Sequence, residues 1–377
     1  MKLMYFLPLL STKGGQERTL TDKANWLANK GHAVMMVTYE NDGPFAYPLD
    51  ERVQFTDLAC PYYQIYSLPF FQRFHVALKI KNIFRTKMAK VVAAFSPDVI
   101  VVTVPLSEFF LTDLMQVIGN IPVVIESHLA HGFDPLARGM TERILDIFYP
   151  PIKAVCRSKL LIALTEGDAR TWRKYHHNVC VIPNPLTCYP TFYPSTLTTH
   201  PPRIICVGRL SPQKRFDRMI DAFALIADKY PVWRVDIFGT GGTDGQLYTQ
   251  QCIADKGLND RIGLHPPVND IYAEYQRSQF FVMSSDFEGF GLVIIEAMAC
   301  GIPVVATDCP FGPSEIIEDG LTGLLAKMTT EDLAEKMEYM IMHDVERRQM
   351  GEHARQVSAR FRLDNVMPLW LKAYQSC

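Results

Sequence analysis

The sequence predicts an α/β protein with two doubly wound domains, each built on a parallel sheet. Patterns of buried strands and amphipathic helices alternate along the whole chain, which is typical of parallel sheets with helices on both faces. The length of 377 residues suits two domains better than one. A proline-rich stretch without helical periodicity, residues 184–202, separates two alternating series.

In the first series, Gln16 to Lys30 reads as a helix that ends at Gly31, a residue type common just past a helix end. The second series follows the proline-rich stretch. The strand patterns of the two series are KLMYFLP, AVMMVTY, DVIVVTV, PVVIES, LLIALT and VCVIP, and then RIICVGR, WRVDIFG, RIGLH, QFFVMSS, PVVAT and GLLA. The boundaries we expect are a domain over 1–185, a linker over 186–202, a domain over 203–360 and a terminal helical stretch over 361–377.

Composition excludes several classes of protein. A net charge of −2 gives no general attraction to nucleic acid, so we expect no nucleic-acid partner. The nine cysteines are scattered without metal-ligand spacing, so Cys206 and Cys300 read as small core residues in a reduced, cytoplasmic protein. Residues 1–10 are apolar but short, and they read as a first strand rather than a signal peptide. No apolar run is long enough to span a bilayer.

The most informative motif is FEGFGLVIIEAMACGIP, residues 287–303. It lies between two buried-strand patterns and reads as a tight loop followed by a short helix. Such a loop lies at the carboxyl end of a sheet, where open α/β folds bind ligands. The amides of Gly291 and Leu292 open the helix and favour an anion there. Glu288 and Glu296 can then hold hydroxyl groups on either side of a bound diphosphate, as in a nucleotide sugar.

A second motif, VGRLSPQKRF, places Gly208 at a strand end and two cations, Arg209 and Lys214, around the turn into a helix. Cations at a helix start oppose the helix dipole, so they indicate an anion at this position. A third glycine turn, KGGQER, brings Gly14 and Gly15 to the start of the first helix, where backbone can approach a ligand closely.

The stretch EGFGLVIIEAMACGIPVVAT resembles the signature of retaining glycosyltransferases of family 4, which have the GT-B architecture. The resemblance implies two Rossmann-like domains that face each other across a cleft, with a terminal helix that returns to the first domain. The alternative for the terminal stretch is a helix packed on its own domain. Coverage is strong over 203–325 and weaker over the first domain.

The resemblance also implies roles for individual residues. Arg209 and Lys214 would bind the phosphates of the donor, and Glu296 would bind the ribose hydroxyls. Glu288 and the amides of Phe290 and Gly291 would hold the transferred sugar. Gly239, in the turn FGTGGTDG, matches the turn beneath the nucleotide. The stretch LHPPVND departs from the family, because its two prolines stand where relatives often carry a glycine that receives the base.

On the acceptor side, His128 follows a strand end, and relatives often have a histidine there that lines the sugar pocket. His131 is the fallback, and a histidine satisfied within its loop is the alternative. Residues 73–90 combine six basic residues with interspersed apolar ones and no acid. This stretch fits two interpretations equally well. It is either a helix that lies on the anionic inner face of the cell membrane, or a surface helix packed on the sheet.

The expected function is a retaining glycosyltransferase that moves a hexose or N-acetylhexosamine from a nucleotide-diphosphate sugar, a UDP-sugar, to a glycan or lipid-linked glycan in cell-surface polysaccharide or lipopolysaccharide synthesis. No Asp-x-Asp motif occurs, so we expect no metal and no cofactor. Front-face displacement is the expected mechanism, and double displacement through Glu288 is second. The rival functions are a nucleotide-sugar epimerase, a non-catalytic nucleotide-sugar-binding subunit and, more distantly, a Rossmann dehydrogenase.

Overall fold

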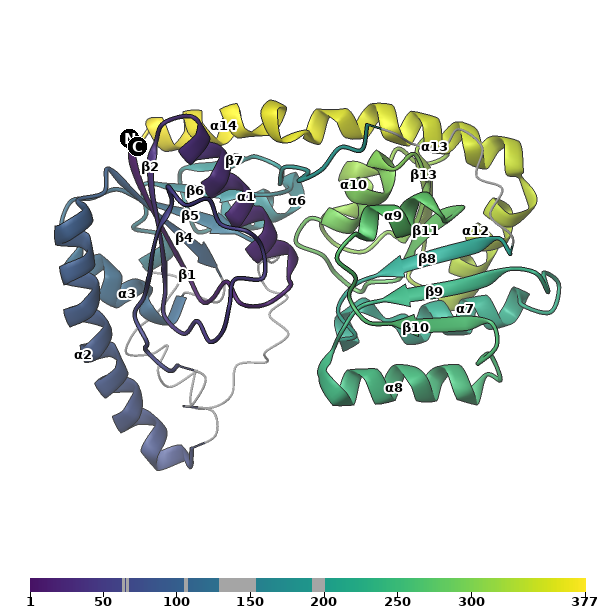
Figure 1. Ribbon diagram of the computed structural model, residues 1–377, viewed down its shortest axis with the longest axis horizontal. Coiled ribbons are helices and arrows are strands. Elements are labelled where there is room, and N and C mark those ends of the chain that lie inside the picture. The colour runs from purple at the N-terminus through teal and green to yellow at the C-terminus, as the bar shows by residue number, and fades with distance from the viewer. Residues whose placement is uncertain (63–64, 66–67, 105–107, 129–153, 192–200) are drawn as a thin grey trace. The chain divides into compact units, whose positions relative to one another are not determined.

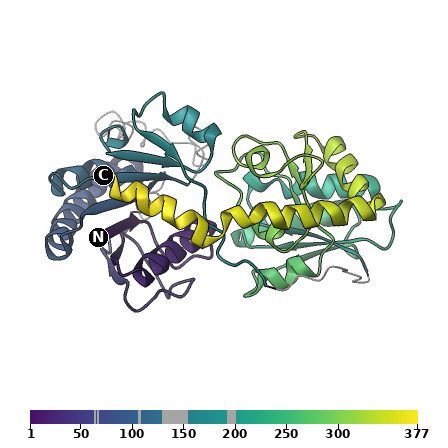
Figure 2. The same cartoon turned by 90° about the horizontal axis from the view of Figure 1, so that it is seen from above.

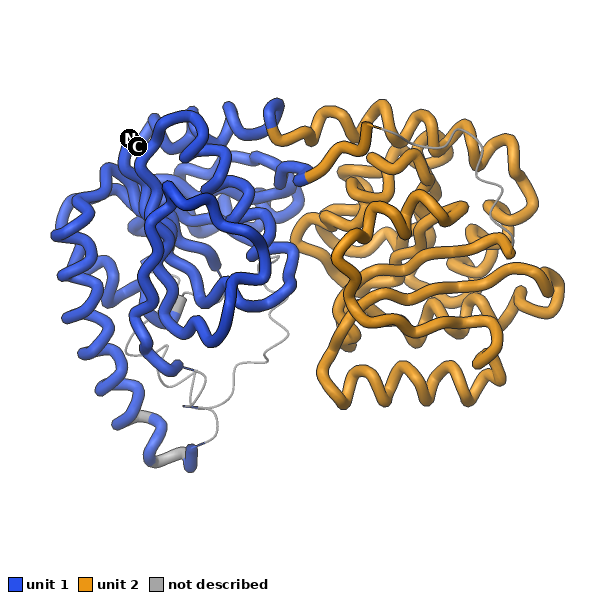
Figure 3. Tube along the Cα trace, in the orientation of Figure 1, with its two compact units in different colours: residues 1–187, 364–377 blue, residues 188–363 orange. Residues whose placement is uncertain are grey.

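The computed structural model describes residues 1–62, 65, 68–104, 108–128, 154–191 and 201–377. It consists of two compact α/β units (Figures 1 and 3). The first unit contains Met1–Thr187 together with Asp364–Cys377, and the second contains Cys188–Leu363. The chain therefore leaves the first unit once and returns to it at its carboxyl end, so that both termini belong to the first unit (Figure 2).

The first unit is built on a seven-stranded parallel sheet with the order β3-β2-β1-β4-β5-β6-β7. Its strands are β1 (Lys2–Leu7), β2 (Ala33–Thr38), β3 (Gln54–Asp57), β4 (Val99–Val104), β5 (Val123–Ser127), β6 (Leu160–Ala163) and β7 (Val179–Val181). Six of the seven follow the strand patterns of the sequence. The edge strand β3 was not foreseen, because only polar and half-buried residues form it.

Helices cover both faces of this sheet. They are α1 (Gly15–Asn29), α2 (Phe70–Phe95), α3 (Glu108–Val117), α6 (Glu166–Trp172) and α14 (Leu363–Gln375). The end of α1 agrees with the prediction, since Gly31 has a φ of +82° just beyond its last turn. Alternate residues of β1 point to opposite faces. Phe6 therefore packs with α2 and α3, whereas Tyr5 contacts Tyr374 of α14.

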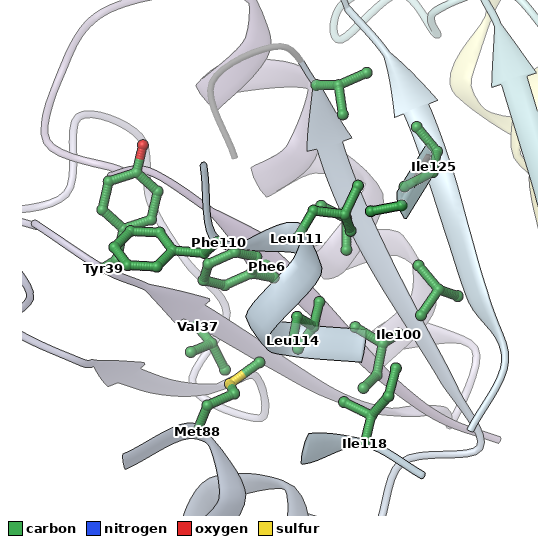
Figure 4. Packing of buried hydrophobic residues seen from close by; sticks show 14 of the residues in the cluster. Phe6, Val37, Tyr39, Met88, Ile100, Phe110, Leu111, Leu114, Ile118 and Ile125 are labelled. Carbon is green, nitrogen blue, oxygen red and sulfur yellow. The ribbon is translucent and has the colours of Figure 1, made fainter. Parts of the chain in front are cut away.

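The core between the sheet and the helices α2 and α3 is rich in aromatic rings (Figure 4). The rings of Phe6, Tyr39 and Phe110 lie together, with centroids 5.0–6.3 Å apart. From α2, Phe84 and Met88 are fully buried in the same cluster. Part of the apolar face of α2 thus packs in the protein core, whereas Ile83 of the same helix is exposed.

The second unit contains a six-stranded parallel sheet with the order β10-β9-β8-β11-β12-β13. Its strands are β8 (Arg203–Val207), β9 (Arg234–Phe238), β10 (Ile262–His265), β11 (Phe280–Met283), β12 (Val304–Thr307) and β13 (Gly323–Ala326). Each one lies within a strand pattern of the sequence. The expected linker over 186–202 includes residues 192–200, which lie outside the described part of the chain.

The helical elements of this unit are η2 (Pro212–Lys214), α7 (Phe216–Ile226), α8 (Gly242–Asp255), α9 (Ile271–Gln276), α10 (Leu292–Ala299), α11 (Pro313–Ile316), α12 (Thr330–Met342), α13 (Asp344–Ser358) and η3 (Ala359–Phe361). The order of strands reverses at β8, which pairs with β9 on one side and with β11 on the other. Parallel sheets bind ligands beyond the carboxyl ends of the strands at such a switch point. The loops after β8 and β11 are therefore the place to look for a site.

Candidate active site

Two loops meet at the switch point of the second unit, one after β8 and the other after β11. Glu288 lies in the second loop and is buried, with 6% of its surface exposed. Its Oε1 accepts hydrogen bonds from Lys214 Nζ and from Ser285 Oγ, both at 2.6 Å. The structure thus brings together one predicted cation and one predicted carboxylate, and it adds Ser285, which the sequence analysis did not single out.

The two loops are also joined through their backbones. Gln213 Nε2 donates to the carbonyl of Phe287 at 2.8 Å, and the amide of Asp286 donates to the carbonyl of Gln213 at 2.9 Å. Ser284 Oγ lies 2.9 Å from the carbonyl oxygen of Lys214. These bonds fix the position of Lys214 relative to Glu288.

A second group of charges supports the same loops and was missed by the sequence analysis. Asp286 is bound by the guanidinium groups of Arg215 and Arg218. Arg215 also binds Asp217, and these acidic partners raise the pKa of the Arg215 guanidinium. Arg215 itself has a φ of +48°, which turns the chain from η2 into α7. Only the cluster of charged residues in KRFDR, which contains both signs, hinted at this group.

Arg209 differs from the other cations at this edge. It is exposed, and its guanidinium makes no hydrogen bond or ion pair with any residue that the structure describes. In contrast, Lys214 is bound to the carboxylate of Glu288, and Arg215 is bound to that of Asp217. Arg209 is therefore the cation in these two loops whose charge remains available to an anionic ligand.

Glycines let the backbones at the ends of β8 and β9 come into direct contact. A Cβ at Gly239 would lie 1.9 Å from the carbonyl oxygen of Gly208, so no larger residue fits without a backbone shift. At Gly208 a Cβ would lie 3.5 Å from the methylene carbons of Lys214. The methylene groups of Lys214 thus lie over Gly208, and its ammonium group bonds Glu288.

Helix α10 begins beside the same loop. Its N-cap, Gly291, has a φ of +97°, a conformation that favours glycine. Leu292 is the first helical residue, and Phe290 packs edge-on against Phe361 with centroids 5.7 Å apart. Glu296 lies in the middle of the helix and is 7% exposed, and its Oε2 accepts a hydrogen bond from the Tyr275 hydroxyl at 3.4 Å.

The loop after β10 contains the prolines that depart from the family pattern. His265 at the end of β10 stacks on Phe238 with centroids 4.8 Å apart, and its Nε2 lies 2.8 Å from Asp236 Oδ1. His265 directly precedes Pro266 and Pro267, and its side chain offers both a ring and a hydrogen-bonding group. Sequence reasoning did not select it.

The remaining predicted residues lie in the first unit. Gly14 is the N-cap of α1 and Gly15 its first residue, and Gln16 donates to Thr103 near the carboxyl end of β4 at 3.1 Å. A Cβ at Gly14 would meet only the flexible carboxylate of Glu17, so the turn does not demand glycine for packing.

His128 follows β5 in the same unit, and its side chain is only 3% exposed. Its Nε2 lies 3.0 Å from Glu126 Oε2, and burial lowers the pKa of the imidazole. The ring is thus held by a carboxylate. His131, the fallback for the same role, lies outside the described residues.

Neither a metal-binding cluster nor a membrane-spanning helix occurs among the described residues. Among them, no group of three or more histidine, cysteine or acidic side chains is arranged to hold a metal ion. None of the described helices combines the length and the apolar character needed to cross a membrane.

Two units built on parallel sheets, with a cation–carboxylate pair at the switch point of the second, agree with what is expected of a glycosyltransferase of the GT-B architecture. Family models agree: residues 13–188 match the model described as "Glycosyltransferase Family 4", and residues 193–357 match "Glycosyl transferases group 1". The chain belongs to these GT-B glycosyltransferases of the family 4 type.

Individual relatives give the same assignment. An uncharacterised glycosyltransferase of Haemophilus influenzae is 26% identical over 376 residues and 98% of each chain. A poly(ribitol-phosphate) α-N-acetylglucosaminyltransferase of Staphylococcus aureus is 29% identical over 45% of this chain and 34% of its own length.

Two solved structures share the fold across the whole chain. Anabaena Alr3699/HepE in complex with UDP and glucose has a TM-score of 0.77 with 21% identity over all of both chains. Staphylococcus aureus TarM, in a complex that includes UDP, also has a TM-score of 0.77, with 16% identity over 99% of each chain.

Proposed function

We propose that this glycosyltransferase moves a hexose or N-acetylhexosamine, with retention of configuration, from a UDP-sugar to a glycan or lipid-linked glycan of the cell surface. The observation that carries the proposal is the arrangement after β8 and β11. There Lys214 contacts Glu288 at the switch point of one sheet, and the exposed Arg209 lies in the same loop as Lys214. The names of the Staphylococcus aureus relative and of the solved UDP complexes support the donor and acceptor classes.

The cations suit the departure of a nucleoside diphosphate. Negative charge grows on the leaving phosphate as the glycosidic bond breaks, and fixed cations stabilise it. A lysine ammonium has three donors, of which the structure assigns one to Glu288. We assign the others to a phosphate oxygen, with Arg209 as the second phosphate ligand.

Glu288 is better suited to hold the sugar than to attack it. One of its oxygens already accepts two hydrogen bonds, from an ammonium and from a hydroxyl. Charge-assisted bonds of this kind stabilise the carboxylate and reduce its nucleophilicity. This geometry supports front-face displacement, in which a phosphate oxygen of the donor takes the proton of the attacking hydroxyl. Double displacement through Glu288 is the second mechanism.

The other predicted donor ligands keep their proposed roles. Glu296, on α10, would bind the ribose hydroxyls, and the amides at the start of that helix would bind an oxygen of the sugar or phosphate. Gly14, Gly15 and Gly239 would allow close backbone approach to the donor. We further propose that transfer needs no metal ion, and unchanged rates after treatment with EDTA would support this. A rate restored only by Mg²⁺ or Mn²⁺ would refute it.

A cytoplasmic location fits the use of a nucleotide sugar and the nine cysteines, all of which are free thiols. Contact with the membrane through residues 73–90 would be mainly electrostatic, since Ile83, at 36%, is the only described apolar side chain of this stretch that is exposed. The exposed residues Lys79 and Lys90 would supply it. Binding to anionic vesicles should then disappear at high salt, and binding that survives salt would contradict this contact.

The experiment that tests the donor is a thermal-shift comparison of UDP-, GDP- and ADP-sugars. A ligand that binds only the folded protein raises its melting temperature. We expect the largest shift with a UDP-sugar and its loss in Arg209→Gln. Equal shifts with all three, or none, would overturn the assignment.

Analysis of the reaction products distinguishes a transferase from the two rival functions. An epimerase would convert the donor alone into an epimeric nucleotide sugar, whereas a transferase would only hydrolyse it slowly. A silent binding subunit would bind the donor and turn over no acceptor.

A further inference from the structure

A buried polar cluster in the first unit joins four elements. Glu126 at the end of β5 accepts a hydrogen bond from Lys23 of α1 at 2.7 Å and one from the Tyr374 hydroxyl of α14 at 2.5 Å, both at Oε1. Tyr5 of β1 lies 3.1 Å from the Tyr374 hydroxyl. The ammonium of Lys23 also lies 3.1 Å from the ring centroid of Trp370. All five side chains are completely buried.

Burial disfavours both charges of this cluster, but the ions compensate each other. Desolvation opposes ionisation of Glu126, yet Lys23 and His128 together hold its pKa at about 2. Desolvation lowers the pKa of Lys23 to about 8, so the ammonium persists at neutral pH. An isolated buried charge would be far more costly. The cluster is therefore neutral as a whole, and each of its two charges is paired with the other.

The two oxygens of Glu126 serve different partners. Oε1 binds Lys23 and Tyr374, whereas Oε2 lies 3.0 Å from His128 Nε2. A carboxylate only accepts, so the neutral imidazole must carry its proton on Nε2. Nδ1 is then the acceptor. The rotation of the carboxylate is fixed by two donors on one oxygen, and this sets the orientation of the imidazole on the other.

We propose that Glu126 is a positioning residue that fixes the tautomer and orientation of His128 and makes both depend on the docking of helix α14 through Tyr374. The part that concerns catalysis rests on the proposed role of His128 at the sugar. In this arrangement α14 does more than cover the sheet. The Tyr374 hydroxyl and the His128 ring bind the two oxygens of the same carboxylate.

Two tyrosines make a matched pair of variants for the test. Tyr374→Phe removes the hydroxyl that bonds Glu126, while Tyr5→Phe removes an equally buried hydroxyl that does not touch it. The full-length protein is labelled with ¹⁵N-histidine, and the His128 signals are assigned by comparison with His128→Asn. Ring nitrogen shifts report the tautomer without any need for turnover. The kcat of transfer is measured in parallel, and melting temperatures check the fold.

We expect Tyr374→Phe to shift the ring nitrogen signals of His128 and to lower kcat about tenfold, with little change in the KM for the donor. Tyr5→Phe should do neither. In the Tyr374→Phe background, His128→Ala should cost less than it does in the wild type. Identical His128 signals in the two phenylalanine variants would overturn the proposal.

A second variant guards against a loss of folding. Lys23→Met combined with Glu126→Gln removes the buried pair without leaving one charge alone, and it too should shift the His128 signals. Unchanged signals in this variant would also overturn the proposal. Failure of the proposed function would appear differently, as a lack of transfer by the wild-type protein, while the nitrogen signals would still decide whether Glu126 positions His128.

Discussion

The ammonium of Lys214 lies 2.6 Å from Oε1 of Glu288, although 74 residues separate the two in the chain. Both side chains are largely buried, so the contact is shielded from water. Parallel pairing of β8 with β11 brings the two loops together. This contact thus links the two strongest sequence motifs. A substitution at either residue should change activity measurably.

Lys214→Ala should lower kcat for transfer by about 10²–10³-fold, the usual cost of removing one donor that stabilises charge in the transition state. The fold should persist, because Ser285 still bonds Glu288. Steady-state kinetics and thermal melting measure the two effects. Lys229→Ala, which removes an exposed lysine of the same unit, is the control and should leave kcat unchanged. Near-normal kcat in Lys214→Ala would reject the phosphate assignment.

Glu288→Ala should be nearly inactive, and added azide should not restore turnover. In front-face displacement no covalent sugar–enzyme bond forms, so a small external nucleophile has no missing group to replace. In double displacement, azide would take the place of the carboxylate. Mass spectrometry detects a glycosyl azide among the products, and proton NMR gives its anomeric configuration. A glycosyl azide of inverted configuration would establish Glu288 as the nucleophile.

Gly239→Ala should destabilise the protein by about 1–3 kcal/mol, as overpacking usually does, and weaken donor binding. The new Cβ would lie 1.9 Å from the Gly208 carbonyl oxygen and would displace the strand end that carries Lys214. Gly208→Ala is the matched comparison, because its Cβ would make an ordinary 3.5 Å contact. Urea unfolding and donor titration should show a larger loss for Gly239→Ala, and equal losses would refute the steric argument.

Acid should destabilise the first unit through Glu126. The folded pKa of about 2 is below the ordinary value of 4.5, so the ionised carboxylate stabilises the fold above the ordinary pKa. This contribution is lost as the pH falls from about 5 to about 2. Urea unfolding at a series of pH values should give a flatter pH dependence for Lys23→Met/Glu126→Gln than for the wild type.

Glu335→Gln, which removes an exposed carboxylate, is the control for the loss of one acid and should follow the wild type. A pH dependence of the paired variant as steep as that of the wild type would show that Glu126 is not a source of acid sensitivity.

The local parts of this fold could be predicted from the sequence, but the contacts between distant segments could not. Strands such as β8 and β11 follow from runs of apolar residues, and the turn at Gly291 follows from its glycine. The hydrogen bond from Tyr374 to Glu126 joins residues 248 positions apart, and no periodicity encodes such a pairing.

The same limit explains two particular gaps. The strand β3 has no apolar alternation to reveal it, because it lies at an edge of the sheet. For α2 the amphipathic pattern was correctly seen, yet a pattern cannot say what covers the apolar face. The structure shows that Phe84 and Met88 face the core.

The position of α14 has a consequence for how the protein is made. Residues 364–377 belong to the first unit but are synthesised after the whole of the second. Until then the ribosome carries a first unit in which the Lys23–Glu126 pair lacks Trp370 and Tyr374. Nascent chains generally fold domain by domain from the amino end. Here the amino-terminal domain can bury its Lys23–Glu126 pair under Trp370 and Tyr374 only after the second unit has been synthesised.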